Sequence, residues 1–236
     1  MIFEWYRGSD TSKTLPRRLN DLRQHEEAMS YKETIKVFRE LLEIEKEPNW
    51  RGYLLWRIGR NYLSGDCHQE AITAFLDAKR EFDPLLGTFT DVVAEYCDSL
   101  YYLLLDYSQR DEIEVVAELA LAITANLDHS RCDEFEKGFV FSQQGYALNM
   151  LAKKHSLDSL RPLALASYLR WHHLQPEEPS CLEALAYAYF RIGDMVHSRS
   201  VVQMCLEVAP AGEVRDRVEE FAREHARELD PASGAS

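Results

Sequence analysis

The sequence predicts an all-α fold in which amphipathic helices pack in successive pairs. Apolar residues recur at helical spacing along nearly the whole chain, as in the run from Val214 to Leu229, and this is typical of helices with one buried face. Prolines and two Gly-Asp pairs stand between the helical runs, where a helix can end. No set of alternating runs bounded by turn residues indicates a sheet.

The elements are expected in a simple order, with a first helix (helix A) and a second helix (helix B) in each pair. A first pair lies within 15–47, with Leu22 on its helix A and Phe38 on its helix B. The pair at 89–126 has no clear signature. The pair at 138–177 contains Gly145 and Tyr168 and a long turn at 153–161. A last single helix is expected at about 213–229.

The two clearest pairs, which start near Gly52 and Pro179, share one pattern of small and aromatic residues. The first reads Leu55-x-x-Ile58-Gly59-x-x-Tyr62, Gly65-Asp66, Ala71-x-x-x-Phe75, Ala78 and Pro84; the second reads Leu182-x-x-Leu185-Ala186-x-x-Tyr189, Gly193-Asp194, Ser198-x-x-x-Val202, Cys205 and Pro210. This pattern resembles the tetratricopeptide repeat (TPR), a helix–turn–helix unit of about 34 residues.

The resemblance implies a right-handed superhelical solenoid of about five TPR-like helix pairs plus a C-terminal capping helix. Small residues such as Gly59 and Ala186 would let helix A and helix B approach closely. The sequence departs from the family at Leu55 and Leu182, which stand where the family has tryptophan, and its spacings exceed 34 residues in the middle. A helical bundle without repeats stays open as the alternative.

Three segments are predicted: an N-terminal arm at 1–14, a repeat domain at 15–229 and a disordered tail at 230–236. The arm carries Ile2, Phe3, Trp5 and Tyr6. These side chains could dock on the chain's own groove, on a second copy in a homodimer, or on a partner. Alternatively, they cover the exposed apolar face of the first repeat.

The resemblance also implies a binding groove lined by residues two, five, nine and twelve places into each helix A. The candidates are Tyr53, Trp56 and Arg60 with Leu63; Phe139, Tyr146 and Asn149 with Ser142; and Glu183, Tyr187 and Phe190 with Ser180. Aromatic anchors of this kind favour a protein or peptide ligand, although each can instead pack against the next helix A. Arg57, Arg60 and Asn61 resemble a clamp for a peptide carboxylate, but the matching Lys in a following repeat is absent.

The charge of the chain disfavours nucleic acid as a partner. With 40 acidic and 27 basic residues, the net charge is −13, whereas phosphate contacts need clustered Lys and Arg. Residues 111–136 hold eight acidic side chains and one basic side chain. This stretch could steer a basic partner, or it could be a solvated helix face.

No motif predicts catalysis, a cofactor or a metal. His172 and His173 are adjacent, so they point about 100° apart on a helix, and His129, Cys132, Asp133 and Glu134 cluster only loosely. No stretch approaches the roughly 18 apolar residues that a membrane span needs. The five cysteines are scattered, which favours reduced thiols and a cytoplasmic location.

The sequence therefore predicts a non-enzymatic protein-interaction module, a scaffold or adaptor that binds a peptide or helix of its partner in the groove. Two alternatives place an acidic surface at the centre of the function. One is an immunity or inhibitor protein that occludes a basic toxin or nuclease. The other is a dedicated chaperone for one client protein.

Overall fold

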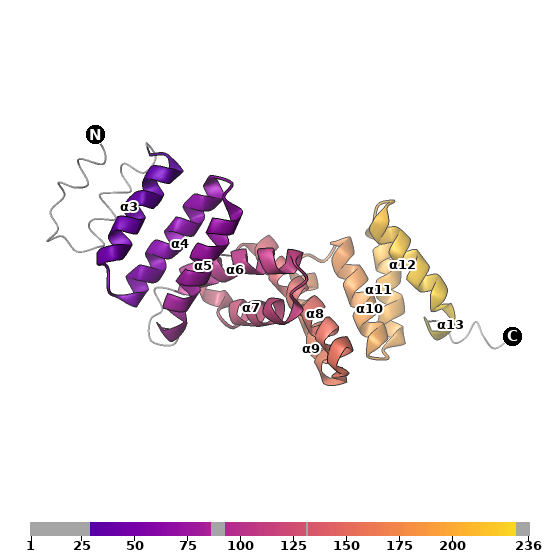
Figure 1. Cartoon of the computed structure of the whole chain (residues 1–236). Coiled ribbons are helices and arrows are strands. Elements are labelled where there is room, and N and C mark those ends of the chain that lie inside the picture. Colours follow the sequence, from indigo (N-terminus) through magenta and orange to yellow (C-terminus); the bar gives the residue numbers. More distant parts are fainter. Residues whose placement is uncertain (1–28, 86–92, 131, 230–236) are drawn as a thin grey trace. The chain divides into compact units, whose positions relative to one another are not determined.

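The computed structural model describes residues 29–85, 93–130 and 132–229. The chain divides into two compact units, residues 1–103 and 104–236, which we call the N-terminal and C-terminal units and describe separately. Within the described ranges the chain forms eleven α-helices and three short 3₁₀ helices, and no strand (Figure 1). The prediction of an all-α fold of consecutively paired helices is confirmed for these ranges. The arm at 1–14 and the tail at 230–236 lie outside the described residues.

The N-terminal unit consists of consecutive helices packed side by side. Ser30 begins the first of the described helices with a capping box, in which its hydroxyl and the Glu33 carboxylate satisfy each other's backbone N–H groups. Pro48 is the first residue of the next helix, where its missing N–H costs nothing. The elements are α3 (Tyr31–Ile44), α4 (Pro48–Ser64), α5 (His68–Phe82), η1 (Asp83–Leu85) and the first part of α6 (Val93–Gln109).

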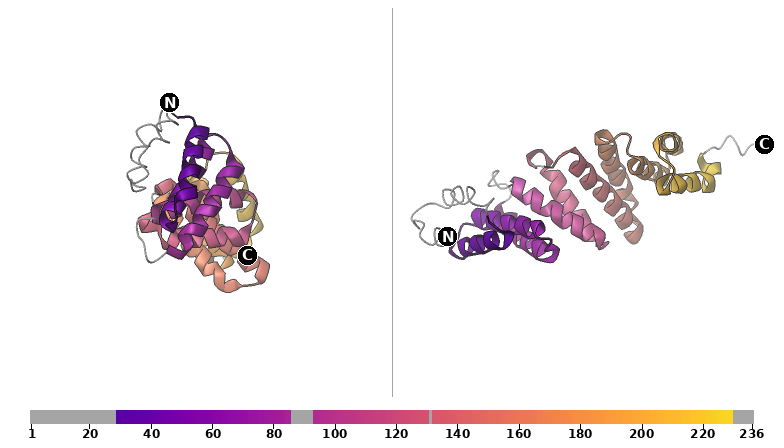
Figure 2. Two further views of the ribbon diagram at one scale, coloured as in Figure 1. Left: turned by 60° about the vertical axis from the view of Figure 1, so that its left-hand side comes forward. Right: turned by 90° about the horizontal axis from the view of Figure 1, so that it is seen from above.

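Within the C-terminal unit, each helix is likewise packed against the next from α7 to α12 (Figure 2). Its core combines small residues, such as Ala186 and Cys205, with the aromatic side chains of Tyr168 and Phe221. Its elements after α6 are α7 (Ile113–Ala125), η2 (Leu127–His129), α8 (Glu134–His155), η3 (Asp158–Leu160), α9 (Arg161–Leu174), α10 (Pro179–Arg191), α11 (Met195–Val208), α12 (Glu213–Glu224) and α13 (Ala226–Leu229).

The same turn ends helix A in four helix pairs. A residue one or two places after each helix takes a left-handed conformation, with φ of 56° at Asp66, 57° at Asp111, 54° at Ser156 and 85° at Gly193. The next N–H then donates to the carbonyl five residues earlier, as from Cys67 to Tyr62 and from Asp194 to Tyr189. This bond satisfies a carbonyl at the helix end. The repeated turn places α6–α7 in register with the clear pairs, which the sequence could not do.

Glycine permits close packing of helix A on helix B, as predicted. A Cβ built on Gly59 would lie 2.7 Å from the ring of Phe75, and one on Gly145 would lie 2.5 Å from the ring of Tyr168. No real Cβ contact is that short. In α10 the equivalent residue is Ala186, whose carbonyl accepts a hydrogen bond of 2.9 Å from the Ser198 hydroxyl on α11.

An arginine near the start of helix A caps the preceding helix B at two junctions. Arg51 Nη1 donates to the carbonyls of Leu42 and Glu45 at the end of α3, each at 3.1 Å. Arg215 Nη1 donates to the carbonyls of Leu206 and Ala209 at the end of α11, at 3.0 and 3.1 Å. Each arginine lies nine residues after one of its acceptors and six residues after the other. Because the spacing is the same at both junctions, α12 occupies the position of a helix A.

Several details differ from the sequence predictions. Asp66, and not Gly65, is the left-handed residue of the first turn, because Gly65 has φ of −102°. The turn expected at 153–161 is shorter, since α8 continues through His155 with three basic side chains in its last turn. The final helix expected at 213–229 is divided at His225 into α12 and α13.

Candidate functional site

The predicted groove residues of α4 are joined to α6 by a polar network. Trp56 is 9% exposed, and its Nε1–H donates to Asp98 Oδ2 at 2.6 Å. Arg60 Nη1 lies 3.3 Å from the same carboxylate oxygen and 2.8 Å from the hydroxyl of Tyr102. The ring of Tyr102 stacks on Phe75 with centroids 5.0 Å apart. Trp56 and Arg60 therefore join two successive A helices.

The other predicted residues of α4 are also engaged within the N-terminal unit. Arg57 Nη1 donates to the Tyr53 hydroxyl at 3.2 Å, and its guanidinium lies 5.2 Å from the centroid of the Phe38 ring. Asn61 Nδ2 donates to the Arg57 carbonyl at 2.9 Å. The residues of the proposed carboxylate clamp thus have partners of their own. Tyr53 and Arg57 are half-buried.

The predicted residues of α8 differ in exposure. Tyr146 is 42% exposed, and its hydroxyl donates to Asp111 Oδ1 at 3.2 Å. Asn149 is 7% exposed and its Nδ2 lies 3.4 Å from the Tyr168 hydroxyl. Burial raises the pKa of Tyr168 to about 12. Phe139 is half-buried. Tyr146 is therefore the α8 candidate with the most surface open to a ligand.

In α10 the predicted residue Glu183 is the buried half of an ion pair with α12. Arg217 binds it through two bonds, Nε to Oε1 at 2.6 Å and Nη2 to Oε2 at 2.7 Å. Arg217 Nη1 also donates to Glu213 at 2.6 Å. Hydrogen bonding to Glu183 raises the pKa of Arg217. This forked geometry holds α10 and α12 together.

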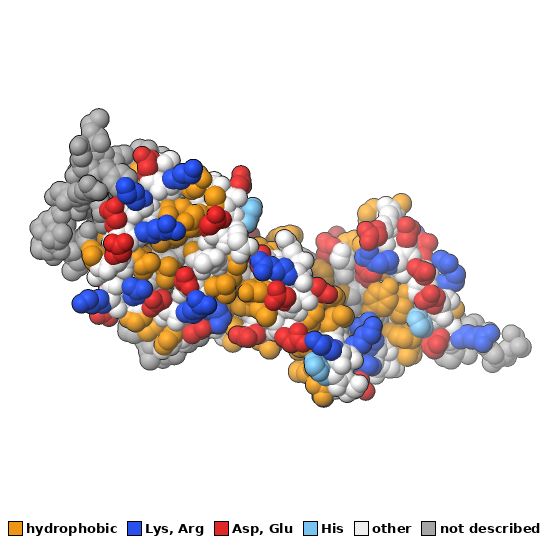
Figure 3. Space-filling model, in the orientation of Figure 1, with side chains coloured by type: hydrophobic (Ala, Val, Ile, Leu, Met, Phe, Trp, Pro, Cys, Tyr) orange, Lys and Arg blue, Asp and Glu red, His pale blue; other side chains and the backbone are white. Residues whose placement is uncertain are grey.

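A pocket of about 380 Å³ lies between α10 and α12, and two predicted groove residues, Tyr187 and Phe190, line it. Phe221 forms its floor, with its ring centroid 4.4 Å from that of Tyr187 and 5.3 Å from that of Phe190. The ring of His225 lies 4.3 Å from that of Phe190. Charged side chains complete the lining: Arg191, Arg217, Glu220 and Glu224. Figure 3 shows hydrophobic side chains bordered by charged ones over this part of the unit.

The electrostatic environment of Tyr187 reflects these neighbours. Burial is the main cause that raises the pKa of its hydroxyl, and the carboxylates of Glu183, Glu220 and Glu224 raise it further. Arg217 acts in the opposite direction. The pocket is therefore apolar at its floor and predominantly acidic around Tyr187.

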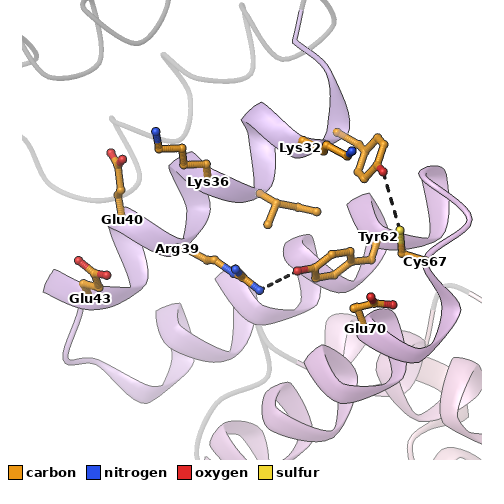
Figure 4. Close-up of a pocket in the computed structure, with 10 residues that line it drawn as sticks. Lys32, Lys36, Arg39, Glu40, Glu43, Tyr62, Cys67 and Glu70 are labelled. Carbon is orange, nitrogen blue, oxygen red and sulfur yellow. Dashed lines mark hydrogen bonds between the residues drawn. The ribbon is translucent and has the colours of Figure 1, made fainter.

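A second hollow, of about 610 Å³, lies on the N-terminal unit over α3 (Figure 4). Arg39 Nη2 donates to the Tyr62 hydroxyl at 2.6 Å, and the Tyr31 hydroxyl lies 3.8 Å from Cys67 Sγ. Its charged lining is balanced, with three basic and three acidic side chains: Lys32, Lys36, Arg39, Glu40, Glu43 and Glu70. No predicted groove residue lines it.

Other predicted features have less support. The arm residues Ile2, Phe3, Trp5 and Tyr6 lie outside the described residues. In the acidic stretch, Asp133 and Glu136 form the capping box of α8, and Glu114 pairs with Lys154. These carboxylates stabilise the local structure.

In the described ranges, no cluster of three or more His, Cys, Asp or Glu could hold a metal. None of the helices in those ranges is long and apolar enough to cross a membrane.

The sequence could not identify Asp98, Arg217, Phe221 and His225 as parts of these sites. Asp98 lies in the segment whose register was open, and α12 was interpreted only as a polar cap. Arg51 and Arg215 could have indicated that α12 is equivalent to a helix A, because each stands at the same distance in sequence from the end of the preceding helix B.

No protein-family model matches the chain, and no curated protein does. Among solved structures, a structure of MamA from AMB-1 is 14% identical, with 83% of this chain and 91% of that chain covered and a TM-score of 0.49. A second MamA structure is 14% identical, with 86% and 90% covered and a TM-score of 0.47. A chain of the APC/C hetero-tetramer Cut9–Hcn1 is 12% identical, with 81% and 39% covered and a TM-score of 0.43.

Proposed function

We propose that this chain is a protein-interaction module that holds a segment of a partner protein against its A helices. The observation that carries the proposal is the pocket between α10 and α12, where the predicted groove residues Tyr187 and Phe190 meet Phe221. Aromatic side chains that are partly exposed in a concave site are the usual anchors of protein recognition.

The pocket favours this function over one centred on the acidic stretch at 111–136. Several carboxylates there have partners within the structure, among them Asp111, Glu114, Asp133 and Glu136. An immunity protein or dedicated chaperone acting through that stretch is therefore the weaker proposal. The cytoplasmic location stays a prediction from the cysteine spacing.

The proposal is tested by selecting twelve-residue peptides from a random display library against the full chain. The selected peptides are then measured against Phe190→Ala and against Val196→Ala. Phe190 lines the pocket, whereas Val196 is an apolar residue of α11 that is 72% exposed and lies outside the pocket lining.

We expect Phe190→Ala to weaken peptide binding by about tenfold or more, as for a central anchor, and Val196→Ala to leave it unchanged. Circular dichroism confirms that both variants keep their helices. Failure to select any peptide, or equal affinities for the two variants, would contradict the proposal.

A further inference from the structure

Two carboxylates at the rim of the α10–α12 pocket have no partner in the part of the chain that the structure describes. Glu220 and Glu224 are one helical turn apart on α12, and both are exposed and line the pocket. Neither makes a hydrogen bond or an ion pair with any residue in the described ranges. Side chains four residues apart share a helix face, so both negative charges act on a ligand in the same pocket.

The arginine beside them is already neutralised. Arg217 is bound by Glu183 and Glu213 through three bonds of 2.6 to 2.7 Å. Of the arginines that line the pocket, Arg191 is the other one, and the two carboxylates of Glu220 and Glu224 outnumber it. A ligand with negative charge would meet an excess of like charge at this rim.

The walls of the pocket suit a cation. The aromatic rings of Tyr187, Phe190 and Phe221 meet edge to face, with interplanar angles of 71° and 84°. Aromatic faces attract Lys and Arg through their quadrupole, and the aliphatic part of these side chains packs against apolar surface. A pocket lined by these rings and by the carboxylates of Glu220 and Glu224 therefore complements both parts of a basic side chain.

We propose that the pocket between α10 and α12 takes an arginine or lysine side chain from a basic segment of the partner protein. This inference rests on the proposed function and specifies the chemistry of the partner. The net charge of −13 adds a field that accelerates encounter with such a segment.

The test uses the full chain and three capped peptides, Ac-GAARAAG-NH2 and its counterparts with Gln or Glu at the central position. Binding is measured from chemical-shift changes in ¹H–¹⁵N spectra during titration at low salt. The test variant is Glu220→Gln with Glu224→Gln. The matched control is Glu112→Gln with Glu177→Gln, which changes the net charge equally at exposed positions outside the pocket lining.

The Arg peptide is expected to shift Tyr187, Phe190 and Phe221 signals and to bind at least about fivefold more tightly than the Gln peptide. The Glu220/Glu224 variant removes that preference, whereas the control variant keeps most of it. Raising the salt concentration reduces the preference in the wild-type chain.

Two binding results with the wild-type chain overturn the inference and leave the proposed function intact. These are equal binding of the Arg and Gln peptides at the pocket, and tighter binding of the Glu peptide. Equal loss of the preference in both double variants also overturns it, because the charge of the whole chain would then explain the effect. Absence of shifts with all three peptides, together with a failed library selection, overturns both proposals.

Discussion

The two junctions between successive A helices, α4 to α6 and α10 to α12, use the same positions with different chemistry. Trp56 and Glu183 each lie six residues before the tyrosine that begins the turn, and each bonds to the next helix A, at Asp98 and Arg217. Arg60 and Tyr187 lie two residues before that tyrosine, and they contact Tyr102 and Phe221. The positions that the repeat assigns to a ligand therefore also hold the solenoid together.

The two junctions differ in how much aromatic surface they leave accessible to a ligand. At the α4–α6 junction the bulky indole of Trp56 is buried, and its polar atom is used by Asp98. At the α10–α12 junction the ion pair of Glu183 and Arg217 is compact, and it leaves Tyr187 and Phe190 beside an open pocket. Joining two helices by a charged pair thus frees the aromatic residues for binding.

The largest effect is expected from Trp56→Ala, which breaks the α4–α6 junction. Loss of a buried tryptophan leaves a cavity and removes one of the two hydrogen bonds to Asp98, so the free energy of unfolding should fall by about 3 to 5 kcal/mol. Urea unfolding followed by circular dichroism measures the change. Val196→Ala, at an exposed position, is the control and should change stability little. A similar small loss for Trp56→Ala would show that the indole is not part of the core. Trp56→Ala is therefore a test of stability and not of partner binding.

Arg217→Met should have the next largest effect, at the α10–α12 junction. The methionine keeps the apolar packing of the arginine stem but leaves the buried carboxylate of Glu183 without its partner. We expect a loss of about 2 kcal/mol, below the value for a fully buried pair because Arg217 is partly exposed. Arg80→Met is the control, because its pair with Asp77 is exposed and should contribute at most about 0.5 kcal/mol. Equal losses in the two variants would contradict a structural role for the Glu183 pair.

The fold was largely predictable from the sequence, because its determinants are local. The small residues Gly59 and Ala186 predicted where helix A approaches helix B, and apolar periodicity predicted the helices. The register of 89–126 was not predictable, because its turn uses Asp111 in a left-handed conformation where the second clear pair has Gly193. A non-glycine residue at this position removes the sequence signal while the backbone geometry persists.

The candidate site was only partly predictable, since it depends on contacts between residues far apart in sequence. Tyr187 and Phe190 were among the predicted residues, and both line the pocket between α10 and α12; that they bind a partner stays a prediction. Whether Trp56 or Glu183 faces a ligand depends on Asp98 and Arg217, which are 42 and 34 residues further along the chain. No local pattern reveals such a partner.

A smaller effect is expected from Asp98→Asn at the α4–α6 junction. The amide oxygen of asparagine can still accept from Trp56 Nε1, but the charge that holds Arg60 is lost. Since Arg60 is half exposed, the loss of stability should be about 0.5 to 1 kcal/mol in urea unfolding. Asp98→Ala removes the acceptor as well and should cost about 1 kcal/mol more. Equal costs for the two substitutions would mean that the Trp56 hydrogen bond contributes nothing.

The smallest effect at neutral pH is expected from Tyr187→Phe at the α10–α12 junction. The hydroxyl lies 3.5 Å from the Arg217 carbonyl, so its loss should cost about 0.5 kcal/mol or less at pH 7. The difference between the two chains should instead appear at alkaline pH. The pKa of Tyr187 is raised in the folded state from its ordinary value of 10.0, mainly by burial and then by Glu183.

Above pH 10 the unfolded chain therefore loses this proton before the folded chain does, which favours unfolding. The stability linked to neutral Tyr187 is fully present below pH 10 and is lost as pH rises through the higher folded pKa. Urea unfolding between pH 8 and pH 11 should show a steeper decline for the wild-type chain than for Tyr187→Phe. Tyr168 titrates in both chains and cancels in the difference. Parallel declines would mean that the pKa of Tyr187 is the same in the folded and the unfolded chain. Neither burial nor the nearby carboxylates would then act on its hydroxyl.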